Sequence, residues 1–419
     1  MMAQKADIAI VGGGIVGLSA AIHLQRMGRK PLLIDKDAIG AGASYGNAGV
    51  LASGSVVPVT VPNLIPKIPA MLVKKSSPLF VKWHYLPFMA GFLSRYLLHC
   101  HPDKVKHIAK GLAPLVQDSC DQHKNLADDG QSRQFIRDCH YVFAYKNRAA
   151  YEADKFGWEL RRQNGFEWDI YEKQAIKTIE PDLSPDYQWV AAIKHNGHIS
   201  DPGAYLAALA DEYRKAGGKF YKGELCDIMP KESGVVLHFN DGAMVEADKA
   251  IIASGAWSGR LAKAQGIKVG LESERGYHIE ILGSNITPNN PIIEAEGKFV
   301  ASPMQGRIRF AGLVEFGGLN ALPAKAPLRY LYEGAKRMFP QLSMPAFESK
   351  QIITWQGHRP ATPDSLPVIG QSPQSPHVIF AYGHHHIGLT AGPKTGLIAA
   401  QLANHIQPNL DLSPYSPAR

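Results

Sequence analysis

Three glycines near the N-terminus, Gly12, Gly14 and Gly17, stand between an apolar run at residues 8–11 and an amphipathic stretch. Glycine at this spacing allows a tight turn, a close approach of the backbone to a pyrophosphate, and close packing of a helix on a strand. The N-terminus of that helix would offer free N–H groups to the phosphates. We therefore expect a dinucleotide site here that extends into the first helical turn, at Ile15 and Val16.

An acidic residue, Asp35, ends the second apolar run, residues 31–34, eighteen positions after Gly17. A carboxylate at this place accepts hydrogen bonds from a ribose 2′-OH. The acid therefore favours a free ribose hydroxyl, and so NAD or FAD over NADP. Strand, glycines, helix, strand and acid follow in this order within about thirty residues, which is more specific than the glycines alone. The predicted site includes the neighbouring Lys36.

Three consecutive histidines, His384, His385 and His386, raise the question of a metal site. Adjacent residues of an extended chain point to alternate sides, and no second cluster with metal-ligand spacing accompanies them. We therefore predict no metal, and expect one of the three, His385, to line the pocket. The four cysteines have no CxxC spacing and are typical of reduced cytosolic thiols.

Length and composition bound the class of protein. The 419 residues are enough for two domains, and 45% hydrophobic and 20% charged residues are ordinary for a globular protein. The net charge of +8 suits an anionic partner, but no run of Lys or Arg exceeds two residues, so we predict no nucleic acid. The first strand begins by residue 7 and no apolar stretch reaches about 18 residues, so we expect a cytoplasmic protein.

A segment at residues 78–99 is rich in aromatic and large apolar side chains, is broken by Pro87, and carries Lys82, His84 and Arg95. Such stripes are more often core than membrane anchor, so we expect a buried pair of helices. The alternative is a peripheral contact with the inner face of a membrane, in which the basic residues meet lipid head groups.

The remaining pattern predicts discontinuous domains. Proline-rich connections at residues 58–69 lead into helix-like stretches as far as about residue 185. A helix is expected to follow Asp201 and to end at Gly217, and a hairpin is expected at residues 241–242. Alternation over 271–350 indicates antiparallel sheet. We predict an α/β, Rossmann-like dinucleotide domain from residues 1–85, 190–270 and 351–419, and an α+β substrate domain with antiparallel sheet from 86–189 and 271–350.

Six ordered motifs carry a family resemblance: the N-terminal fingerprint, GASYGNAGV at 42–50, GHISDPGAYLAAL at 197–209, KAIIASGAWS at 249–258, GHRPATPDSLPVIG at 357–370 and GHHHIGLTAGPKTG at 383–396. Together they resemble the FAD-dependent amino-acid oxidoreductases of the D-amino-acid oxidase-like superfamily. Within it the chain is most similar to bacterial D-amino-acid dehydrogenases, including the branch that oxidises hydroxy-D-proline. The resemblance implies FAD as the cofactor, bound without a covalent link.

The resemblance also places residues around the flavin. Small residues let the backbone pass close to a flat ring, and a helix that follows residue 387 would stabilise negative charge near flavin N1 and O2. Leu225 lies where the family has an adenine contact. The other residues that we expect to contact FAD are Ala43, Ser44, Gly46, Asn47, Ala48, Gly49, Ser254, Gly255, Trp257, Gly383, Gly388, Leu389 and Thr390.

Arg359 matches the family arginine that binds the substrate carboxylate, and a guanidinium suits this task because it binds bidentately. A structural arginine bonded to loop carbonyls is the alternative reading, with Arg275 and Arg309 as secondary candidates for the anchor. Tyr277 and Tyr45 are candidates to supply hydroxyls from opposite walls. His358 stands where many relatives carry an apolar residue, which suits a hydroxylated substrate such as hydroxyproline.

The expected reaction is oxidation of a small amino acid, a D-amino acid or a cyclic imino acid, to its imine. Hydride would pass from Cα to flavin N5, and positioning would supply most of the acceleration. We expect electrons to leave for a quinone or another carrier. The alternatives are an oxygen-using D-amino-acid, glycine or sarcosine-type oxidase, or a flavin subunit of a larger electron-transfer complex; an oligomer is compatible with either.

Overall fold

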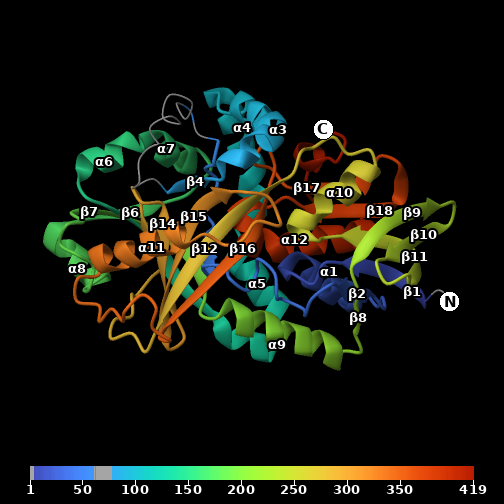
Figure 1. Ribbon diagram of the computed structural model, residues 1–419, viewed down its shortest axis with the longest axis horizontal. Helices are drawn as coiled ribbons and strands as arrows, with labels where there is room; N and C mark the ends of the chain where they lie inside the picture. The colour runs from blue at the N-terminus through green and yellow to red at the C-terminus, as the bar shows by residue number, and fades with distance from the viewer. Residues whose placement is uncertain (1–3, 61, 63–77) are drawn as a thin grey trace.

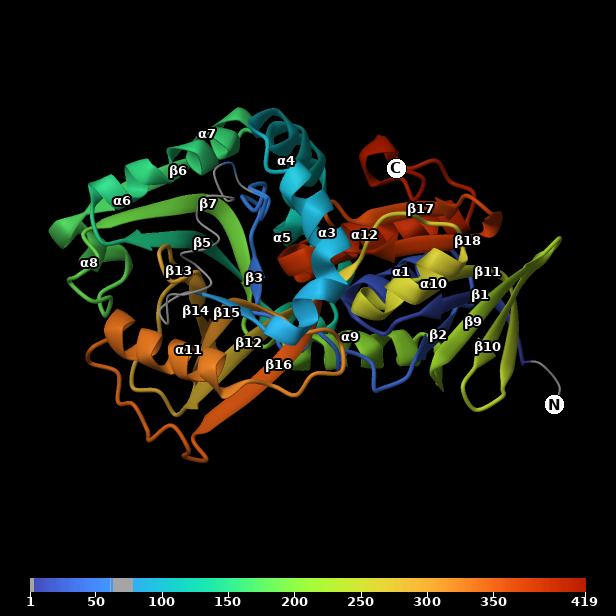
Figure 2. The same cartoon turned by 45° about the horizontal axis from the view of Figure 1, so that its top comes forward.

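The computed structural model describes residues 4–60, 62 and 78–419, and these residues form two β-sheets that stand side by side (Figure 1). The predicted proline-rich connection lies in part, at Pro66 and Pro69, outside the described residues. Helices pack on both sheets, and α3 (Leu86–Leu98) and α4 (Pro102–Val116) lie over the junction between them (Figure 2).

The first sheet has a parallel centre in the order β17-β18-β11-β1-β2-β8, with an antiparallel pair, β17–β18, at one edge. A hairpin of β9 and β10 extends it from β11. Its strands are β1 (Gln4–Val11), β2 (Leu32–Asp35), β8 (Lys219–Lys222), β9 (Leu225–Lys231), β10 (Gly234–Phe239), β11 (Met244–Ile252), β17 (Val368–Ser372) and β18 (Ser375–Tyr382). The predicted order of strand, glycines, helix and strand is confirmed at β1, α1 and β2.

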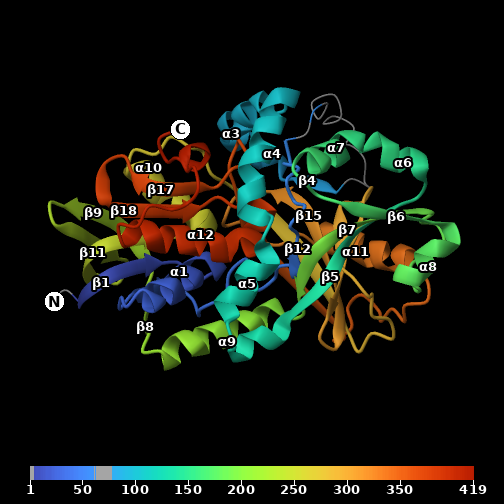
Figure 3. The same cartoon turned by 180° about the vertical axis from the view of Figure 1, so that it is seen from behind.

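Close backbone contacts explain the glycines between β1 and α1 (Ile15–Arg26). A Cβ on Gly12, whose φ is +115°, would lie 2.3 Å from the carbonyl oxygen of Ala253. A Cβ on Gly17 would lie 1.9 Å from the carbonyl oxygen of Gly12. No side chain fits at either place, so glycine is required at both positions for the loop and α1 to pack this closely. Helix α12 (Gly388–Ala403) packs on α1, and it lies on the face of the first sheet that is turned to the viewer in Figure 3.

Two local predictions, for helix α9 and for a hairpin of the first sheet, are confirmed. Helix α9 (Pro202–Lys215) begins after Asp201, whose carboxylate accepts a hydrogen bond from the Ala204 N–H at 3.0 Å and so caps the helix. Strands β10 and β11 form the expected antiparallel hairpin, in which Gly242 takes a φ of +82°. The remaining helices are α5 (Ser119–Ala127), α6 (Arg148–Ala153), α7 (Lys155–Gln163), α8 (Ile176–Ile179), α10 (Ser258–Ala264) and α11 (Lys325–Met338).

The second sheet is mainly antiparallel, as residues 271–350 predicted, and runs β16-β12-β15-β14-β13-β5-β7-β3 with β4 beside β15 and β6 beside β7. Its strands are β3 (Val50–Leu51), β4 (Leu79–Val81), β5 (Ile136–Tyr145), β6 (Trp168–Glu172), β7 (Trp189–Ile199), β12 (Glu272–Leu282), β13 (Ile292–Glu294), β14 (Phe299–Met304), β15 (Arg307–Phe316) and β16 (Ile352–Ala361). Helix α11 packs on β12 and β15, and shares an apolar core with them.

The predicted domain boundaries assign several strands of this second sheet to the dinucleotide-binding domain. Strands β7 and β16 were assigned to the dinucleotide-binding segments, but β7 pairs with β5 and β16 pairs with β12 along ten residues. Strands β3 and β4, within the predicted segment 1–85, also belong to the second sheet. Residues 136–172 include β5 and β6 where helix-like stretches were expected. Local patterns indicate a strand but do not name its partner, which explains these errors.

The expectation of a buried helix pair at residues 78–99 is wrong. The segment forms β4, a short 3-10 turn and the single helix α3, in which Met89 alone is buried. Phe88 is 79% exposed and Trp83 is 61% exposed. One face of α3 lines a cavity, which accounts for part of its apolar character, while its outer face stays open. Among the described residues no helix is long and apolar enough to cross a membrane.

A buried histidine, His123, connects the three helices α5, α9 and α12. His123 of α5 donates from Nε2 to the Leu389 carbonyl at the start of α12, and its Nδ1 accepts from the Tyr205 hydroxyl of α9, both at 2.8 Å. A neutral imidazole has one donor and one acceptor nitrogen, so both bonds are satisfied without a charge. Burial lowers the pKa of His123 from 6.5 to about 4.

Acid should therefore weaken the fold through His123. Its folded-state pKa lies below its unfolded value, so the unfolded chain binds more protons between pH 6.5 and 4 and the unfolding free energy falls with falling pH. We expect His123 to account for about 2 kcal/mol of loss between pH 7 and pH 5. Denaturant unfolding of the wild type and His123→Gln at both pH values measures it. An equal pH dependence in both proteins would contradict the prediction, and the exposed His107→Gln serves as control.

Candidate active site

A single cavity of about 1320 Å³ runs from the β1–α1 loop to the face of the second sheet. Its volume exceeds the roughly 300–1,000 Å³ that is usual for a small-ligand pocket. Residues from both sheets, from α3 and from the start of α12 line it. The cavity is therefore large enough for a ligand that reaches across both halves of the molecule.

The first end of the cavity is the N-terminus of α1. Gly12, Gly14, Ile15 and Val16 line it, as predicted, whereas Gly17 lies behind the loop and serves packing. The first turn of α1 has no acidic residue, and its first N–H, that of Ile15, donates to the Ser44 hydroxyl at 3.1 Å. A Cβ on Gly14 would meet only the Ser44 Oγ, at an ordinary contact distance of 3.4 Å, so a ligand can approach the backbone here. The helix terminus can thus bind an anionic group through its N–H groups.

Asp35 lines the same end, beside Lys36. Its Oδ2 accepts from the Gly13 N–H at 2.6 Å and its Oδ1 accepts from the Asp37 N–H at 2.9 Å. Burial raises the pKa of Asp35, and the two backbone hydrogen bonds act in the opposite direction. A carboxylate has about four acceptor positions, so Asp35 can hold the loop and still accept hydrogen bonds from a ligand.

The indole of Trp257 forms the wall next to Lys36. The Lys36 Nζ lies 4.1 Å from the centre of the Trp257 ring, a cation–π contact, and the ring of His358 meets the same indole edge-on at 5.4 Å. The other predicted residues that line this stretch are Leu225, Ser254 and Gly255. These groups surround the region where the sequence predicted the nucleotide.

The middle of the cavity is bounded by the loop at residues 43–48, of which Ala43, Ser44, Gly46, Asn47 and Ala48 line it. A Cβ on Gly46 would lie 2.2 Å from the Trp355 ring, so the glycine is required for the loop to pass this indole. Trp355 lines the cavity and was missed by sequence reasoning, although it lies within two residues of the GHRP motif.

The start of α12 bounds the other side of this middle part. Gly388, Leu389 and Thr390 line the cavity, and the Thr390 hydroxyl donates to the Val50 carbonyl at 3.1 Å. Besides Gly17, two more residues predicted to contact FAD, Gly49 and Gly383, do not line it. Gly49 has a φ of +77° against the Ile199 carbonyl, and Gly383 has a φ of +90° against Thr362, so both shape turns.

Arg309 is a structural residue and does not line the cavity, contrary to its candidacy as an anchor. It is buried, its Nη2 pairs with Glu280 at 2.7 Å, and its Nη1 donates to the carbonyl of Asn47. The carbonyl of Gly46 accepts from Nδ1 of His278 at 3.0 Å. Arg309 and His278 therefore hold the loop at residues 43–48 against the second sheet.

Arg359 is the predicted anchor that does reach the cavity, and its side chain is 22% exposed. Its Nη1 donates to the Glu274 carboxylate at 3.0 Å and to the Leu313 carbonyl at 2.7 Å, and its Nη2 donates to the Gly312 carbonyl at 3.3 Å. Nε and one Nη2 hydrogen have no acceptor among the described residues. These two donors form one edge of the guanidinium, the geometry that binds a carboxylate bidentately.

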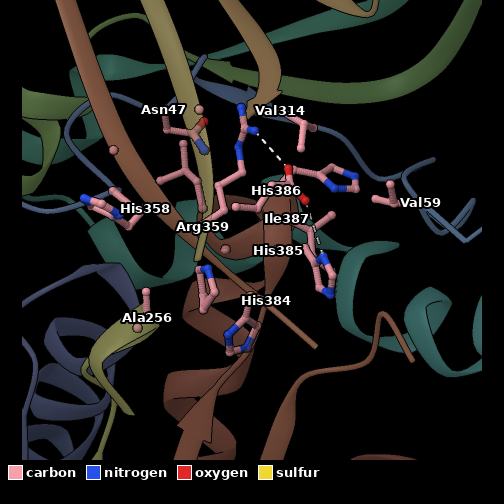
Figure 4. Close-up of a pocket in the computed structure, with 18 of the residues that line it drawn as sticks. Asn47, Val59, Ala256, Val314, His358, Arg359, His384, His385, His386 and Ile387 are labelled. Carbon is pink, nitrogen blue, oxygen red and sulfur yellow. Dashed lines mark hydrogen bonds and ion pairs between the residues drawn. The ribbon is translucent and has the colours of Figure 1, made fainter. Parts of the chain in front are cut away.

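Glycine makes room for this guanidinium. A Cβ on Gly276 would lie 2.5 Å from the Arg359 Cζ, so the group lies flat over the Gly276 backbone. Glu274, two residues before it on β12, is buried and lines the cavity. Sequence reasoning missed Glu274. Glu274 and Gly276 are two residues apart on one strand, so their side-chain positions lie on the same face, next to Arg359. Figure 4 shows the Arg359 guanidinium reaching toward Val314, on the same side of the pocket as His386.

Arg275 and both tyrosine candidates are placed differently from the prediction. Arg275 is fully buried and pairs with Glu315 at 2.8 Å on the far face of β12, outside the cavity lining. Tyr277 borders the cavity, but its hydroxyl donates to Glu315 and accepts from the Ala324 N–H. Tyr45 is 48% exposed and does not line the cavity. Alternation along β12 turns residues 275 and 277 away from Glu274 and Gly276.

The three histidines take separate roles. His384 hydrogen bonds to Thr395 at 2.9 Å, and burial lowers its pKa to about 3. His385 lines the cavity, its Nε2 accepts from the Thr362 N–H at 2.8 Å, and burial lowers its pKa to about 4. Its Nδ1 faces the Glu274 carboxylate at 4.0 Å without a hydrogen bond. His386 is exposed and also lines the cavity, although the sequence analysis selected only His385 as the pocket histidine.

The part of the chain that the structure describes contains no group of three or more His, Cys, Asp or Glu side chains that could hold a metal. The ionic groups at this end of the cavity are the Arg359–Glu274 pair, beside neutral imidazoles. The arrangement can orient a carboxylate and shield it from water, and it offers no strongly basic group next to the anchor.

Comparisons with known proteins agree with this geometry. A model of the FAD dependent oxidoreductase family, DAO, matches residues 7–402. The D-amino-acid oxidase of Bradyrhizobium diazoefficiens is 34% identical over 423 residues that cover 100% of each chain. The D-amino acid dehydrogenase of Dechloromonas aromatica is 23% identical over 96% of this chain and 97% of that protein. The structure of glycine oxidase from Geobacillus kaustophilus shares the fold, with a TM-score of 0.77, 23% identity and 99% coverage of both chains.

Proposed function

The chain belongs to the FAD-dependent oxidoreductase family, and we propose that it oxidises an amino acid whose carboxylate is bound by Arg359. The observation that carries the proposal is the free edge of the Arg359 guanidinium, which faces a cavity whose other end is a glycine-rich helix terminus. A carboxylate and a dinucleotide are the two ligands that these ends suit.

The residues present fit FAD. The accessible backbone at Gly14 and the start of α1, which carries no acidic side chain, suit the pyrophosphate, and Asp35 suits the ribose hydroxyls. The loop at residues 43–48 and the start of α12 would hold the ring system. When bound, FAD supplies the acceptor for the hydride that leaves the substrate Cα.

The protein's own residues contribute position more than proton transfer. Arg359 would bind the carboxylate through Nε and Nη2 while Glu274 and two backbone carbonyls hold the guanidinium still. A substrate fixed in this way needs less reorganisation before Cα reacts. His385 is neutral above about pH 5 because burial lowers its pKa to about 4, so it adds no competing positive charge.

We assign the substrate to the D-amino acids or cyclic imino acids, with hydroxy-D-proline as the named example. The support is the name of the 34% identical relative, a D-amino-acid oxidase. His358 itself lies against Trp257, in the wall of the nucleotide end of the cavity.

We further propose that electrons pass to a quinone or another carrier, with oxygen use as the alternative. Relatives named as oxidases and relatives named as dehydrogenases both match, so the names leave the acceptor open. The support for a quinone is α3, whose inner face lines the cavity while Trp83, Phe88 and Leu98 lie exposed near Lys82 and Arg95. An apolar face flanked by cations suits the surface of an anionic membrane.

Two other functions stay as alternatives, a glycine- or sarcosine-type oxidase and the flavin subunit of a larger electron-transfer complex. A glycine-type substrate is favoured by the likeness to glycine oxidase, but 23% identity supports the fold alone. A subunit of a complex would reduce no dye with any amino acid when it is isolated.

Asp35→Ala should weaken FAD binding. Loss of a charged acceptor for the ribose hydroxyls costs about 1.5–3 kcal/mol, which is roughly a ten- to 150-fold rise in Kd. Flavin fluorescence on titration of apoprotein with FAD measures it. Asp211→Ala on the exposed face of α9 is the control, and Asp35→Asn should fall between the two. An unchanged Kd in Asp35→Ala would remove Asp35 from the cofactor site.

Arg359→Leu should lower kcat/KM for the best D-amino acid by about thirty- to several-thousand-fold, which corresponds to about 2–5 kcal/mol for a charge-assisted pair shielded from water. Dye reduction by the holoenzyme measures it, after a screen of D- and L-amino acids and prolines. The matching amine without a carboxylate should lose much less.

Bound FAD should stay near normal in Arg359→Leu. Equal losses for the amino acid and the amine would show that Arg359 shapes the site, and the proposal of a carboxylate anchor would then be wrong. A wild type that oxidises neither D- nor L-amino acids would contradict the proposed function itself.

The acceptor proposal predicts faster reduction of quinone analogues than of oxygen. It also predicts sedimentation with vesicles that contain anionic phospholipid, which should weaken as salt rises. Phe88→Ser should reduce this sedimentation, whereas Ile406→Ser, also exposed but distant in the fold, should not. Peroxide formed in step with substrate loss would identify an oxidase, and an absence of vesicle binding would exclude the membrane contact.

A further inference from the structure

Another arginine, Arg161 of α7, lines the same cavity as Arg359. It is only 6% exposed. The guanidinium carbon lies 4.8 Å from the centre of the Phe143 ring and 4.6 Å from the Trp158 ring, and Nε donates to the Gly54 carbonyl at 3.2 Å. Two aromatic faces and one hydrogen bond therefore fix the orientation of this cation.

The charge of Arg161 is not neutralised by a contact. Its Nη1 is buried and has no hydrogen-bond acceptor among the described residues, and no described carboxylate lies within 4.0 Å of its nitrogens. Residues 1–3, 61 and 63–77 contain no Asp or Glu, so the rest of the chain offers no acidic partner either. Burial lowers the pKa of Arg161, and nearby acidic groups oppose this shift only in part.

Asp154 is the acidic residue that most offsets this charge, but it does not pair with Arg161. Its Oδ2 accepts from the Tyr145 hydroxyl at 2.9 Å, which in turn accepts from the Trp158 N–H at 3.0 Å. A buried cation without a close partner is costly to a fold, typically by several kcal/mol. An anion that reaches the guanidinium from the cavity, which Arg161 lines, would reduce that cost.

The position of Arg161 separates it from the sites described above. Its partner ring, Phe143, is on β5, whereas the Arg359 guanidinium bonds to two carbonyls of β15. The sheet order β15-β14-β13-β5 puts three strand spacings, about 14 Å along the sheet, between these two places. The helix terminus at Gly14 belongs to the other sheet. An anion at Arg161 would thus be neither the carboxylate at Arg359 nor the pyrophosphate at α1.

We propose that Arg161 binds an acidic group at the remote end of the substrate. The substrate class is then an amino acid whose side chain, or whose substituent on the amine, ends in a carboxylate. Tyr141 and Phe143 line the same part of the cavity, so the spacer between the two charged ends is apolar. The inference rests on the proposed function for the reacting end, and it adds the chemistry of the other end.

Binding can be tested without turnover. The holoenzyme is titrated with straight-chain dicarboxylates of four to about ten carbons and with monocarboxylates of equal length, and flavin absorbance or thermal unfolding reports binding. At one chain length the dicarboxylate should bind about tenfold or more tightly than its monocarboxylate. In Arg161→Met that advantage should disappear, whereas Arg162→Met, the exposed neighbour whose partner is Glu159, should keep it.

Kinetics give the second measurement. D-amino acids that end in a carboxylate are compared with the corresponding ω-amides, in the wild type, Arg161→Met, Arg161→Lys and Arg162→Met. The acid should be preferred about tenfold or more in kcat/KM, Arg161→Met should abolish the preference, and Arg161→Lys should keep part of it. Activity toward D-alanine should change little in Arg161→Met, because alanine does not reach Arg161.

Three results would overturn the inference: no chain length at which the second carboxylate helps, equal losses for acids and amides in Arg161→Met, or the same behaviour in Arg161→Met and Arg162→Met. If neutral amino acids are oxidised but acids have no advantage, the inference fails and the proposed function stands. If dicarboxylates bind through Arg161 but no amino acid of any kind is oxidised, the proposed function fails instead.

Discussion

A buried ionic network centred on Glu280 holds the two halves of the molecule in register. Glu280 accepts from Arg309 and Arg307, and Arg307 also pairs with Asp201, the residue that caps α9. Arg309 then donates to the loop that bounds the middle of the cavity. Helix α9 packs with the first sheet, so one carboxylate connects that sheet, the second sheet and the loop between them. Such a network contributes less to stability than to a unique arrangement, since the desolvation of each charge offsets much of the attraction.

How far the sequence predicts this arrangement depends on the range of the interactions. The β1–α1 loop, the cap of α9 and the hairpin at Gly242 are governed by neighbours within about twenty residues, and all were predicted. The roles of Arg275 and Arg309 depend on which face of a strand meets which partner, and a one-residue step along β12 reverses that face. Glu274 and Trp355 were missed for the same reason. Strands β7 and β16 were assigned to the wrong half because pairing between distant strands leaves no local signal.

Close contacts between glycines and aromatic rings fix the position of the loop at residues 43–48, in addition to the ionic network at Glu280. The Trp355 indole lies between Gly46 of the loop and Gly357 of its own strand, where a Cβ would come within 2.2 and 1.9 Å of the ring. His278 also stacks on this indole, with ring centres 5.2 Å apart, and donates from Nδ1 to the Gly46 carbonyl. The loop therefore cannot shift without displacing a side chain that is fixed on two sides, which keeps the middle of the cavity rigid.

Rigidity of this kind supports the proposed role of Arg359 as the carboxylate anchor, although Arg359 already has partners. The Glu274 carboxylate and the carbonyls of residues 312 and 313 accept from Nη1 and Nη2, and Nε and one Nη2 hydrogen stay without an acceptor among the described residues. The entropy of ordering the side chain is thus lost during folding, not during binding, so more of the interaction with a carboxylate remains as affinity. The neutral state of His385 completes the arrangement, because a second cation at this place would draw Glu274 away from Arg359 and free the guanidinium to move.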